Sequence, residues 1–256
     1  MTPVLAFDIE TVPDVAGIRR LHDLPADLPD REVAEIAFQR RRTQTGSDFL
    51  PPQLQRVVVI SCVMRGDDGI RVFSLDGSEA EIIQRFYDGI EKYVPQLVSW
   101  NGGGFDLPVL NYRGLIHGVA APMFWETGDE NRDFRYNNYV SRYHSRHTDL
   151  MDVLAMYQPR NNAPLDEVAQ LAGLPGKIGV GGAKVWETYL AGDLAGIRDY
   201  CEADTANTYL LYLRYQLLRG ILSKELHGEE VQILKKCLKD QGKPHWQEFL
   251  KLWNDS

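Results

Sequence analysis

Two carboxylates stand close together near the start of the chain. Asp8 and Glu10 follow the apolar run of residues 3–7, and only Ile9 separates them. In a strand, residues two apart point to the same face, so these two negative charges would lie side by side. Repulsion and loss of hydration both disfavour such a pair unless cations balance it. The pair therefore indicates either a solvated or arginine-paired strand end or a site for cations.

Two later segments carry acidic residues at positions where chemistry is possible. In "WNGGGFDLPVL", Asp106 follows a glycine-rich turn and begins a helical pattern, where it could equally serve as an N-cap. In "YCEADTAN", Tyr200 and Asp204 are four residues apart and so share one helix face. A buried tyrosine and a surface salt bridge are the ordinary explanation of that pair. The three segments rarely occur together by chance, so jointly they predict a single acidic site.

Alternating strands and helices must position these residues. Apolar, β-branched runs predict strands at residues 4–9, 57–64, 70–74, 97–100 and, more weakly, 148–150. Helical periodicity predicts helices at residues 78–94, 107–116, 165–172, 194–218 and 223–239, the first with a capping box of Ser78 and Glu81. The "RGDDG" step between the second and third strands predicts a tight hairpin. This order is typical of an α/β layer with a mixed sheet.

Two long segments do not fit a minimal plan of this kind. Residues 13–55 separate the first two strands and contain the helix-like stretch "DREVAEIAFQRRRTQ", which predicts a helical insertion after the first strand. Residues 119–147 lack periodicity but are rich in arginine and aromatic residues. Such segments either cover a functional site or form surface excursions, and the sequence favours neither. We expect one domain at residues 1–220 and a C-terminal helical extension at residues 221–256.

Composition limits the class of protein. The chain has 256 residues, of which 44% are apolar, and a formal net charge of −8, so any nucleic-acid partner must be held by local features. Its longest apolar run is too short to cross a bilayer, and no basic segment followed by an apolar one opens the chain. The three cysteines are far apart and lack a zinc-binding spacing, which indicates free thiols. We therefore expect a cytoplasmic protein that does not bind membranes.

Taken together, the three acidic segments resemble the DEDD superfamily of 3′–5′ exonucleases, which have a ribonuclease-H-like fold. The resemblance covers residues 4–218 and is closest to predicted bacterial exonucleases that are similar to the exonuclease domain of family B DNA polymerases. The histidine subgroup would need a histidine five residues before Asp204, but position 199 is Asp, so the tyrosine subgroup fits. The matching residues fall into three motifs: Asp8 and Glu10; Asn101, Phe105 and Asp106; and Tyr200 and Asp204.

The resemblance implies a mixed five-stranded sheet flanked by helices and two divalent cations, Mg²⁺ or Mn²⁺, which prefer carboxylate oxygens. Asp8 would bridge both cations, and Glu10 and Asp204 would hold the one on the side of the nucleophile. Asp106 would hold the other cation through water. Tyr200 would orient the attacking water by a hydrogen bond, because the ordinary pKa of a phenol is too high for a strong base at neutral pH.

The implied substrate is the single-stranded 3′ end of a nucleic acid, DNA rather than RNA, and the implied partners are proteins of DNA repair or replication. The expected nucleic-acid contacts are Thr11, Asn101, Phe105, Arg135 and Arg142. The last two lie in residues 132–147, where arginines alternate with aromatic residues, a composition that suits single strands. A tyrosine-rich loop packed on the sheet explains that segment equally well, and a core aromatic residue is the ordinary explanation of Phe105.

Other basic residues and other functions stay open at this point. Lys177 and Lys184 lie near glycines and either contact phosphates or belong to an ordinary loop, while Arg40–Arg42 suggest a solvated helix face. A haloacid-dehalogenase-like phosphatase would need a second Asp at position 10 and a late phosphate-binding Lys, and neither is found. A 3′–5′ exoribonuclease and a nucleic-acid-binding accessory protein with an unused site remain as alternatives. The intact acids and Tyr200 count against the accessory protein.

Overall fold

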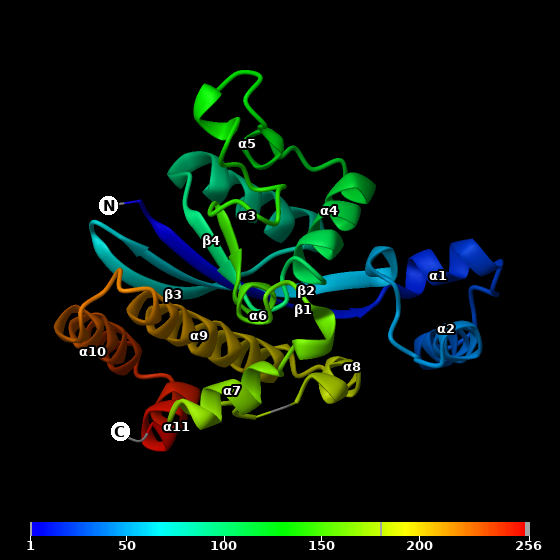
Figure 1. The fold of residues 1–256 in the computed structure, drawn as a ribbon. Helices are drawn as coiled ribbons and strands as arrows, with labels where there is room; N and C mark the ends of the chain where they lie inside the picture. The colour runs from blue at the N-terminus through cyan, green and yellow to red at the C-terminus, as the bar shows by residue number, and fades with distance from the viewer. Residues whose placement is uncertain (1, 180, 254–256) are drawn as a thin grey trace.

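The computed structural model describes residues 2–179 and 181–253 and has a mixed five-stranded sheet at its centre (Figure 1). The strand order is β3-β2-β1-β4-β5. β1 lies in the middle, antiparallel to β2 and parallel to β4, which is in turn parallel to β5. The predicted mixed sheet is thus confirmed, and its strands are β1 (Val4–Pro13), β2 (Gln55–Gly66), β3 (Gly69–Leu75), β4 (Gln96–Ser99) and β5 (His147–Asp149).

The two faces of β1 bury different residues. Leu5, Phe7 and Ile9 pack in one apolar cluster with α3 (Glu79–Tyr93) and α4 (Asp106–His117). Val4 and Ala6 pack in another cluster with α9 (Leu194–Leu218). Because side chains alternate along a strand, positions 8 and 10 belong to the face that α9 covers.

Helix α9 spans the residues predicted for it. The Asp193 side chain caps its start by accepting the N–H of Gly196, and the helix is buried continuously from Tyr200 to Leu213. The reason is that the sheet covers one side of α9 while other helices cover the opposite side. A helix buried all round shows no clear amphipathic stripe, so its own sequence does not reveal which face carries the site.

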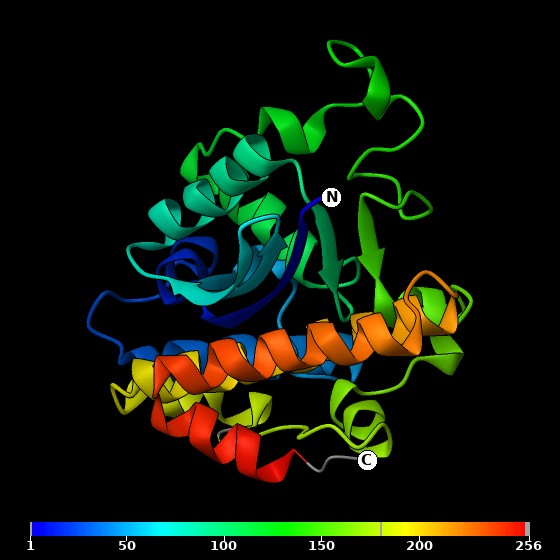
Figure 2. The same cartoon turned by 90° about the vertical axis from the view of Figure 1, so that its left-hand side faces the viewer.

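The C-terminal helices α10 (Lys224–Gln241) and α11 (Pro244–Leu252) pack along α9 (Figure 2). Leu234, Leu238, Trp246 and Phe249 join the same apolar cluster as α9. Gln241 also donates to the carbonyl of Val72 at 3.0 Å, so α10 covers the exposed edge of β3. The C-terminal helices therefore share the core, and the boundary that we place at residues 220 and 221 stays a prediction.

The predicted insertion, residues 13–55, contains α1 (Val15–His22), α2 (Asp30–Thr45) and the short η1 (Pro52–Leu54). It extends away from the sheet and has a small core of its own around Ile18, Val33 and Leu50 (Figure 1). The buried guanidinium of Arg113 joins it to the main body by ion pairs with Asp14 (2.5 Å) and Glu79 (2.6 Å).

The second irregular segment is largely packed on the core. It contains α5 (Pro122–Trp125) and η2 (Arg132–Phe134), and it buries Phe134 and Tyr139 against the α3 side of the sheet. The Arg146 guanidinium lies 3.8 Å from the centroid of the Phe134 ring. The packed-loop explanation therefore holds for these residues, whereas Arg135 and Arg142 are exposed.

Several short elements escape the sequence pattern because each has too few turns to show a helical period. They are α1, α5, α6 (Leu150–Leu154), η3 (Pro159–Asn161), η4 (Gly182–Lys184), α8 (Val185–Leu190) and α11, whereas α7 (Leu165–Leu171) matches the helix predicted at residues 165–172. The last strand ends one residue earlier than predicted, because Asp149 caps α6 by accepting the N–H of Asp152. In the part of the chain that the structure describes, no helix has the length and apolar character needed to cross a bilayer.

Candidate active site

The acids of the first strand lie beside α9. Glu10 is buried and Asp8 is half-buried, and one ligand atom from each lies within 4.8 Å of the other and of the Cys201 thiol. The Cys201 thiol contacts the Asp8 carboxylate at 3.5 Å. An irregularity in the pairing of β1 with β2 follows directly after Glu10. The strand thus presents both carboxylates to the same face of the sheet, as their spacing predicts.

The turn after β4 is built around glycines and Asp149. Asn101 has a positive φ of 66°, a conformation that asparagine tolerates better than most residues. A Cβ on Gly102 would lie 2.3 Å from Ser99 Oγ, and one on Gly104 would lie 2.4 Å from Asn101 Oδ1. Asp149 accepts the backbone N–H groups of Asn101 (2.9 Å) and Gly103 (2.8 Å). These contacts within the turn explain the glycines and fix the start of α4.

Asp106 is the first residue of α4, and Phe105 holds the N-cap position. The alternative explanation of Asp106 as an N-cap is therefore wrong. Its Oδ1 instead accepts the backbone N–H of Ile9 at 3.1 Å, which brings this carboxylate to the strand between Asp8 and Glu10. Burial raises the pKa of Asp106 to about 7.

Tyr200 and Asp204 are both buried on the face of α9 that meets β1. Asp204 Oδ1 has no hydrogen-bond partner among the described residues, so the alternative of a surface salt bridge is wrong. Burial raises the pKa of Asp204 to about 6, and the nearby Tyr200 hydroxyl partly opposes this shift. Burial, followed by the charge of Asp204, raises the pKa of the Tyr200 phenol well above its usual range.

The pKa values of the other two acids, Asp8 and Glu10, are also raised. Burial, and then repulsion by neighbouring carboxylates, raises the pKa of both Asp8 and Glu10 well above the usual range. The positive charge of Lys177 lowers the pKa of Glu10 and Asp204, but this effect is smaller than that of burial. The Lys177 ammonium lies 5.6 Å from the centroid of the Tyr200 ring. The four carboxylates thus form a buried site with an excess of negative charge.

This donor set fits hard divalent cations. Asp204 offers a buried oxygen that has no hydrogen-bond partner within the described part of the chain, and Asp8 and Glu10 offer oxygens close to one another. A set of carboxylate oxygens is what Mg²⁺ and Mn²⁺ prefer, and such cations would offset the repulsion between these side chains. Asp8, Glu10, Asp106 and Asp204 are therefore the residues that could hold them.

A second acidic group already has ion-pair and hydrogen-bond partners. Asp199, Glu202 and His245 lie close enough to share an ion, but Lys243 pairs with Glu202 at 2.9 Å. The His245 ring contacts Asp199 (3.1 Å) and Glu202 (2.9 Å), so this group joins α11 to α9. We assign it a structural role.

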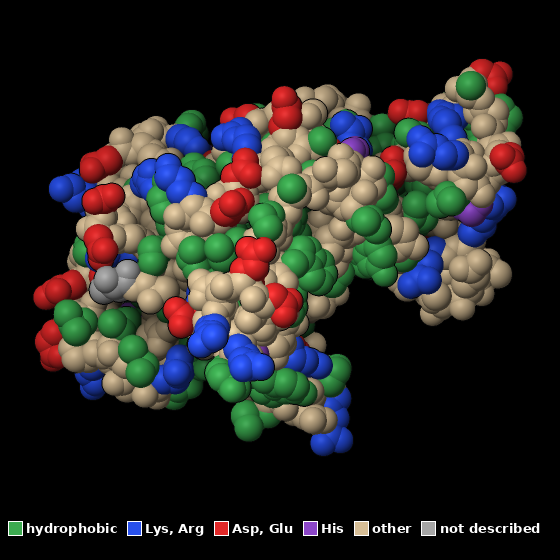
Figure 3. Space-filling view, turned by 90° about the horizontal axis from the view of Figure 1, so that it is seen from above, with side chains coloured by type: hydrophobic (Ala, Val, Ile, Leu, Met, Phe, Trp, Pro, Cys, Tyr) green, Lys and Arg blue, Asp and Glu red, His purple; other side chains and the backbone are tan. Residues whose placement is uncertain are grey.

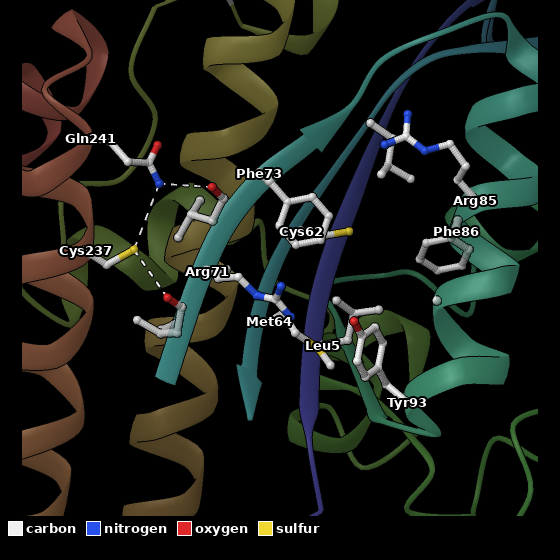
Figure 4. Close-up of a pocket in the computed structure, with 14 residues that line it drawn as sticks. Leu5, Cys62, Met64, Arg71, Phe73, Arg85, Phe86, Tyr93, Cys237 and Gln241 are labelled. Carbon is white, nitrogen blue, oxygen red and sulfur yellow. Dashed lines mark hydrogen bonds between the residues drawn. The ribbon is translucent and has the colours of Figure 1, made fainter. Parts of the chain in front are cut away.

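An apolar cavity of about 440 Å³ lies on the opposite face of the sheet, between β3, α3 and α10 (Figure 4). Leu5, Cys62 and Phe86 line it, together with Arg71 and Arg85. None of the four site carboxylates lines it. The cavity is thus separate from the acidic site.

The expected substrate contacts lie in two places. Thr11, next to Glu10 in the sequence, donates to Gln55 Oε1 at 2.9 Å, and Phe105, next to Asp106 in the sequence, packs against the Phe49 ring at 5.3 Å between ring centroids. Arg142 pairs with Asp152 at 2.7 Å and lies over the Tyr157 ring. Arg135 is exposed, without a side-chain partner within the described ranges. The structure does not bring these two arginines into contact with the carboxylates.

Some residues at the site were not predicted from the sequence. Cys201 lies three residues before Asp204, so helical spacing could have placed it on the same face. The sequence leaves Lys177 open between a phosphate contact and an ordinary loop, and the role of Asp149 as a hydrogen-bond acceptor in the turn has no signal in the sequence. Phe49 lies in the insertion, and no sequence pattern connects it with Phe105.

The fold and the site define the class: a ribonuclease-H-like α/β domain whose acids meet at the central strand. Residues 47–253 match a family model described as predicted 3′–5′ exonuclease related to the exonuclease domain of PolB, and the chain belongs to this family. The matched region leaves Asp8 and Glu10 outside it. No curated protein matches the chain.

Among solved structures, the chain is similar to the family B DNA polymerase from the hyperthermophilic archaeon Pyrobaculum calidifontis, with 21% identity and a TM-score of 0.50. The alignment covers 85% of this chain and 25% of the polymerase, so the chain spans about a quarter of that protein's length. At this level of identity the likeness shows the fold. The expected family and the expected fold are both confirmed.

Proposed function

We propose that the protein is a 3′–5′ exonuclease that removes nucleotides from single-stranded 3′ ends with two divalent cations, Mg²⁺ or Mn²⁺. The observation that carries the proposal is the buried Asp204 oxygen, which has no partner in residues 2–179 and 181–253, next to three further carboxylates with raised pKa values. Such a cluster is unfavourable in a resting protein and indicates a site for cations. Family membership supports the same reaction.

In this proposal, Asp8, Glu10, Asp106 and Asp204 hold the cations. When bound, divalent cations neutralise charge on the phosphodiester and lower the pKa of the attacking water. The Tyr200 hydroxyl, whose pKa is raised, keeps its proton at neutral pH and acts by orienting the water through a hydrogen bond. Asn101, Phe105 and Thr11 lie near these acids in sequence and hold the terminal nucleotide.

Lys177 supplies positive charge beside Tyr200 and the acids of the site. Its side chain is exposed, yet its charge is felt by Glu10 and Asp204, and its ammonium lies near the Tyr200 ring. A cation at this place attracts the phosphate next to the scissile bond. Of the two explanations that the sequence leaves open, we therefore propose the phosphate contact for Lys177.

DNA is the proposed substrate because the similar solved structure is that of a DNA polymerase. Figure 3 shows acidic and basic side chains interspersed over one face of the molecule, in keeping with a net charge of −8. Partners from DNA repair or replication are part of the proposal.

The test is a comparison of 5′-labelled single-stranded DNA, duplex DNA and RNA with Mg²⁺, Mn²⁺ or EDTA. We expect ladders of products shortened one nucleotide at a time from the 3′ end of single-stranded DNA, and no products in EDTA. Faster shortening of RNA would indicate the exoribonuclease instead. The absence of products from all three substrates with either cation, together with retained binding, would favour the accessory protein.

A further inference from the structure

Phe49 is a large apolar residue whose side chain is exposed to solvent. It lies near the end of the insertion, and 58% of its surface is exposed. Its neighbour Leu50 is 3% exposed and belongs to the small core of the insertion. The chain therefore anchors Leu50 inside the insertion and turns Phe49 outward.

The segment that carries Phe49 is tied to α2. Arg41 Nε donates to the carbonyl of Phe49 at 3.1 Å, and Arg42 pairs with Asp48 at 2.6 Å. The backbone N–H of Phe49 donates to Ser47 Oγ at 3.2 Å. These bonds give the exposed ring a defined position, so its exposure is not that of a loose loop tip.

The exposed Phe49 ring packs against a residue of the second acidic motif. Its ring lies 5.3 Å from that of Phe105, at 53°, and Phe105 directly precedes the site acid Asp106. On the other side, Gln55 at the end of the insertion accepts the hydroxyl of Thr11, next to Glu10. The insertion thus contacts the site at both the first and the second acidic motif.

We infer that Phe49 and Phe105 together form a stacking platform for the terminal nucleobase, and that the insertion thereby selects unpaired 3′ ends. The inference rests on the proposed exonuclease function and adds a specificity-determining residue from the insertion. Aromatic rings stack on any nucleobase, whatever its identity, so the platform predicts no base preference. A base that is paired within a duplex already stacks on its neighbours and must leave the helix before it can use the platform.

The inference is tested with Phe49→Ala, with Phe49→Trp as the conservative variant and Leu21→Ala as a matched control. Leu21 is also an exposed apolar residue of the insertion, at 62%, but belongs to α1. The probe is a single-stranded oligonucleotide with 2-aminopurine as its 3′-terminal base, whose fluorescence falls when it stacks. Binding and fluorescence are measured in EDTA, where no cleavage occurs, and cleavage of single-stranded and duplex DNA is measured with Mn²⁺.

We expect the wild-type protein, Phe49→Trp and Leu21→Ala to quench the probe. Phe49→Ala should lose the quenching and bind the oligonucleotide roughly 5- to 150-fold more weakly, the range for one lost stacking partner. Its preference for single-stranded over duplex DNA should fall, while Mn²⁺ affinity and melting temperature stay unchanged.

Quenching and binding by Phe49→Ala at the wild-type level would overturn the inference, and so would an equal loss in Leu21→Ala. These outcomes are distinct from a failure of the proposed function, which would appear as a wild-type protein that cleaves no nucleic acid with either cation. The binding measurement does not depend on cleavage, so it decides the role of Phe49 in either case.

Discussion

The carboxylate of Asp106 accepts the backbone N–H of Ile9 at 3.1 Å, although the two residues are 97 positions apart. Ile9 lies between Asp8 and Glu10, so this one bond places the acid of the second motif between the two acids of the first. The donor is a backbone group, which means that the arrangement depends on the path of β1 and the start of α4. The side chain of residue 9 takes no part in this hydrogen bond.

Replacement of Asp8 with Asn should nearly abolish cleavage and stabilise the protein in EDTA. The change removes a cation ligand, which should cost several kcal/mol of transition-state stabilisation, about 1000-fold or more in rate. It also removes a carboxylate that its neighbours repel, so the melting temperature without cations should rise. Single-turnover assays and thermal melts in EDTA measure the two effects. Wild-type cleavage by a clean preparation of this variant would exclude the proposed site.

Replacement of Tyr200 with Phe tests the orientation of water, because it keeps the buried ring and deletes only the hydroxyl. We expect a loss of about 2–4 kcal/mol, or roughly 30- to 1000-fold, in the single-turnover rate. Mn²⁺ affinity should hardly change, whereas Asp204→Ala should weaken it. If Tyr200→Phe cleaves at the wild-type rate, the hydroxyl has no part in the reaction and Tyr200 serves only packing.

Stability without cations should depend on pH through Asp106. Its pKa is about 7 in the folded protein and near 3.8 when unfolded, so between these values the folded state binds the extra proton. This contribution to stability is complete below pH 4 and is lost as pH rises towards 7, by up to about 1.4 kcal/mol per pH unit. Asp204, with a pKa of about 6, acts in the same direction.

The measurement for this pH effect is urea unfolding in EDTA between pH 5 and pH 8, with Asp106→Asn as the control. Buried His147, whose pKa is lowered to about 4, has an effect of opposite sign, so the difference between the two proteins is the quantity to examine. We expect the wild type to lose more stability than Asp106→Asn as pH rises. Saturating Mn²⁺ should remove the difference in slope. Equal slopes in EDTA would show that Asp106 does not titrate in this range.

The two exposed arginines should behave differently in nucleic-acid binding. Arg142 is held by Asp152 and lies 5.3 Å over the Tyr157 ring, whereas Arg135 is exposed and has no partner in the described ranges. We expect Arg135→Ala to weaken binding and to lower the salt slope by about 0.7, the value for one phosphate contact on a single strand. Arg142→Ala should change the slope less. An unchanged slope in a variant that carries both Arg135→Ala and Arg142→Ala would leave residues 132–147 as plain structure.

The sequence determined the order of the elements and the identity of the acids. The strands come from apolar runs, the amphipathic α3 shows its helical period, and the D-x-E spacing alone puts Asp8 and Glu10 on one face. These features are local. Side-chain directions in a strand or helix repeat every few residues, so the pattern of apolar residues along the sequence has the same period. The same is true of the tyrosine in the third motif, which lies one helical turn from Asp204.

Only the tertiary structure decided which residues meet. The bond from Ile9 to Asp106, the hold of Asp149 on the glycine turn and the contact of Phe49 with Phe105 join segments that are 46 to 97 positions apart. The raised pKa values likewise depend on burial beneath α9. Long-range contacts of this kind leave no period in a single sequence, since their energy comes from packing and desolvation after the chain has folded.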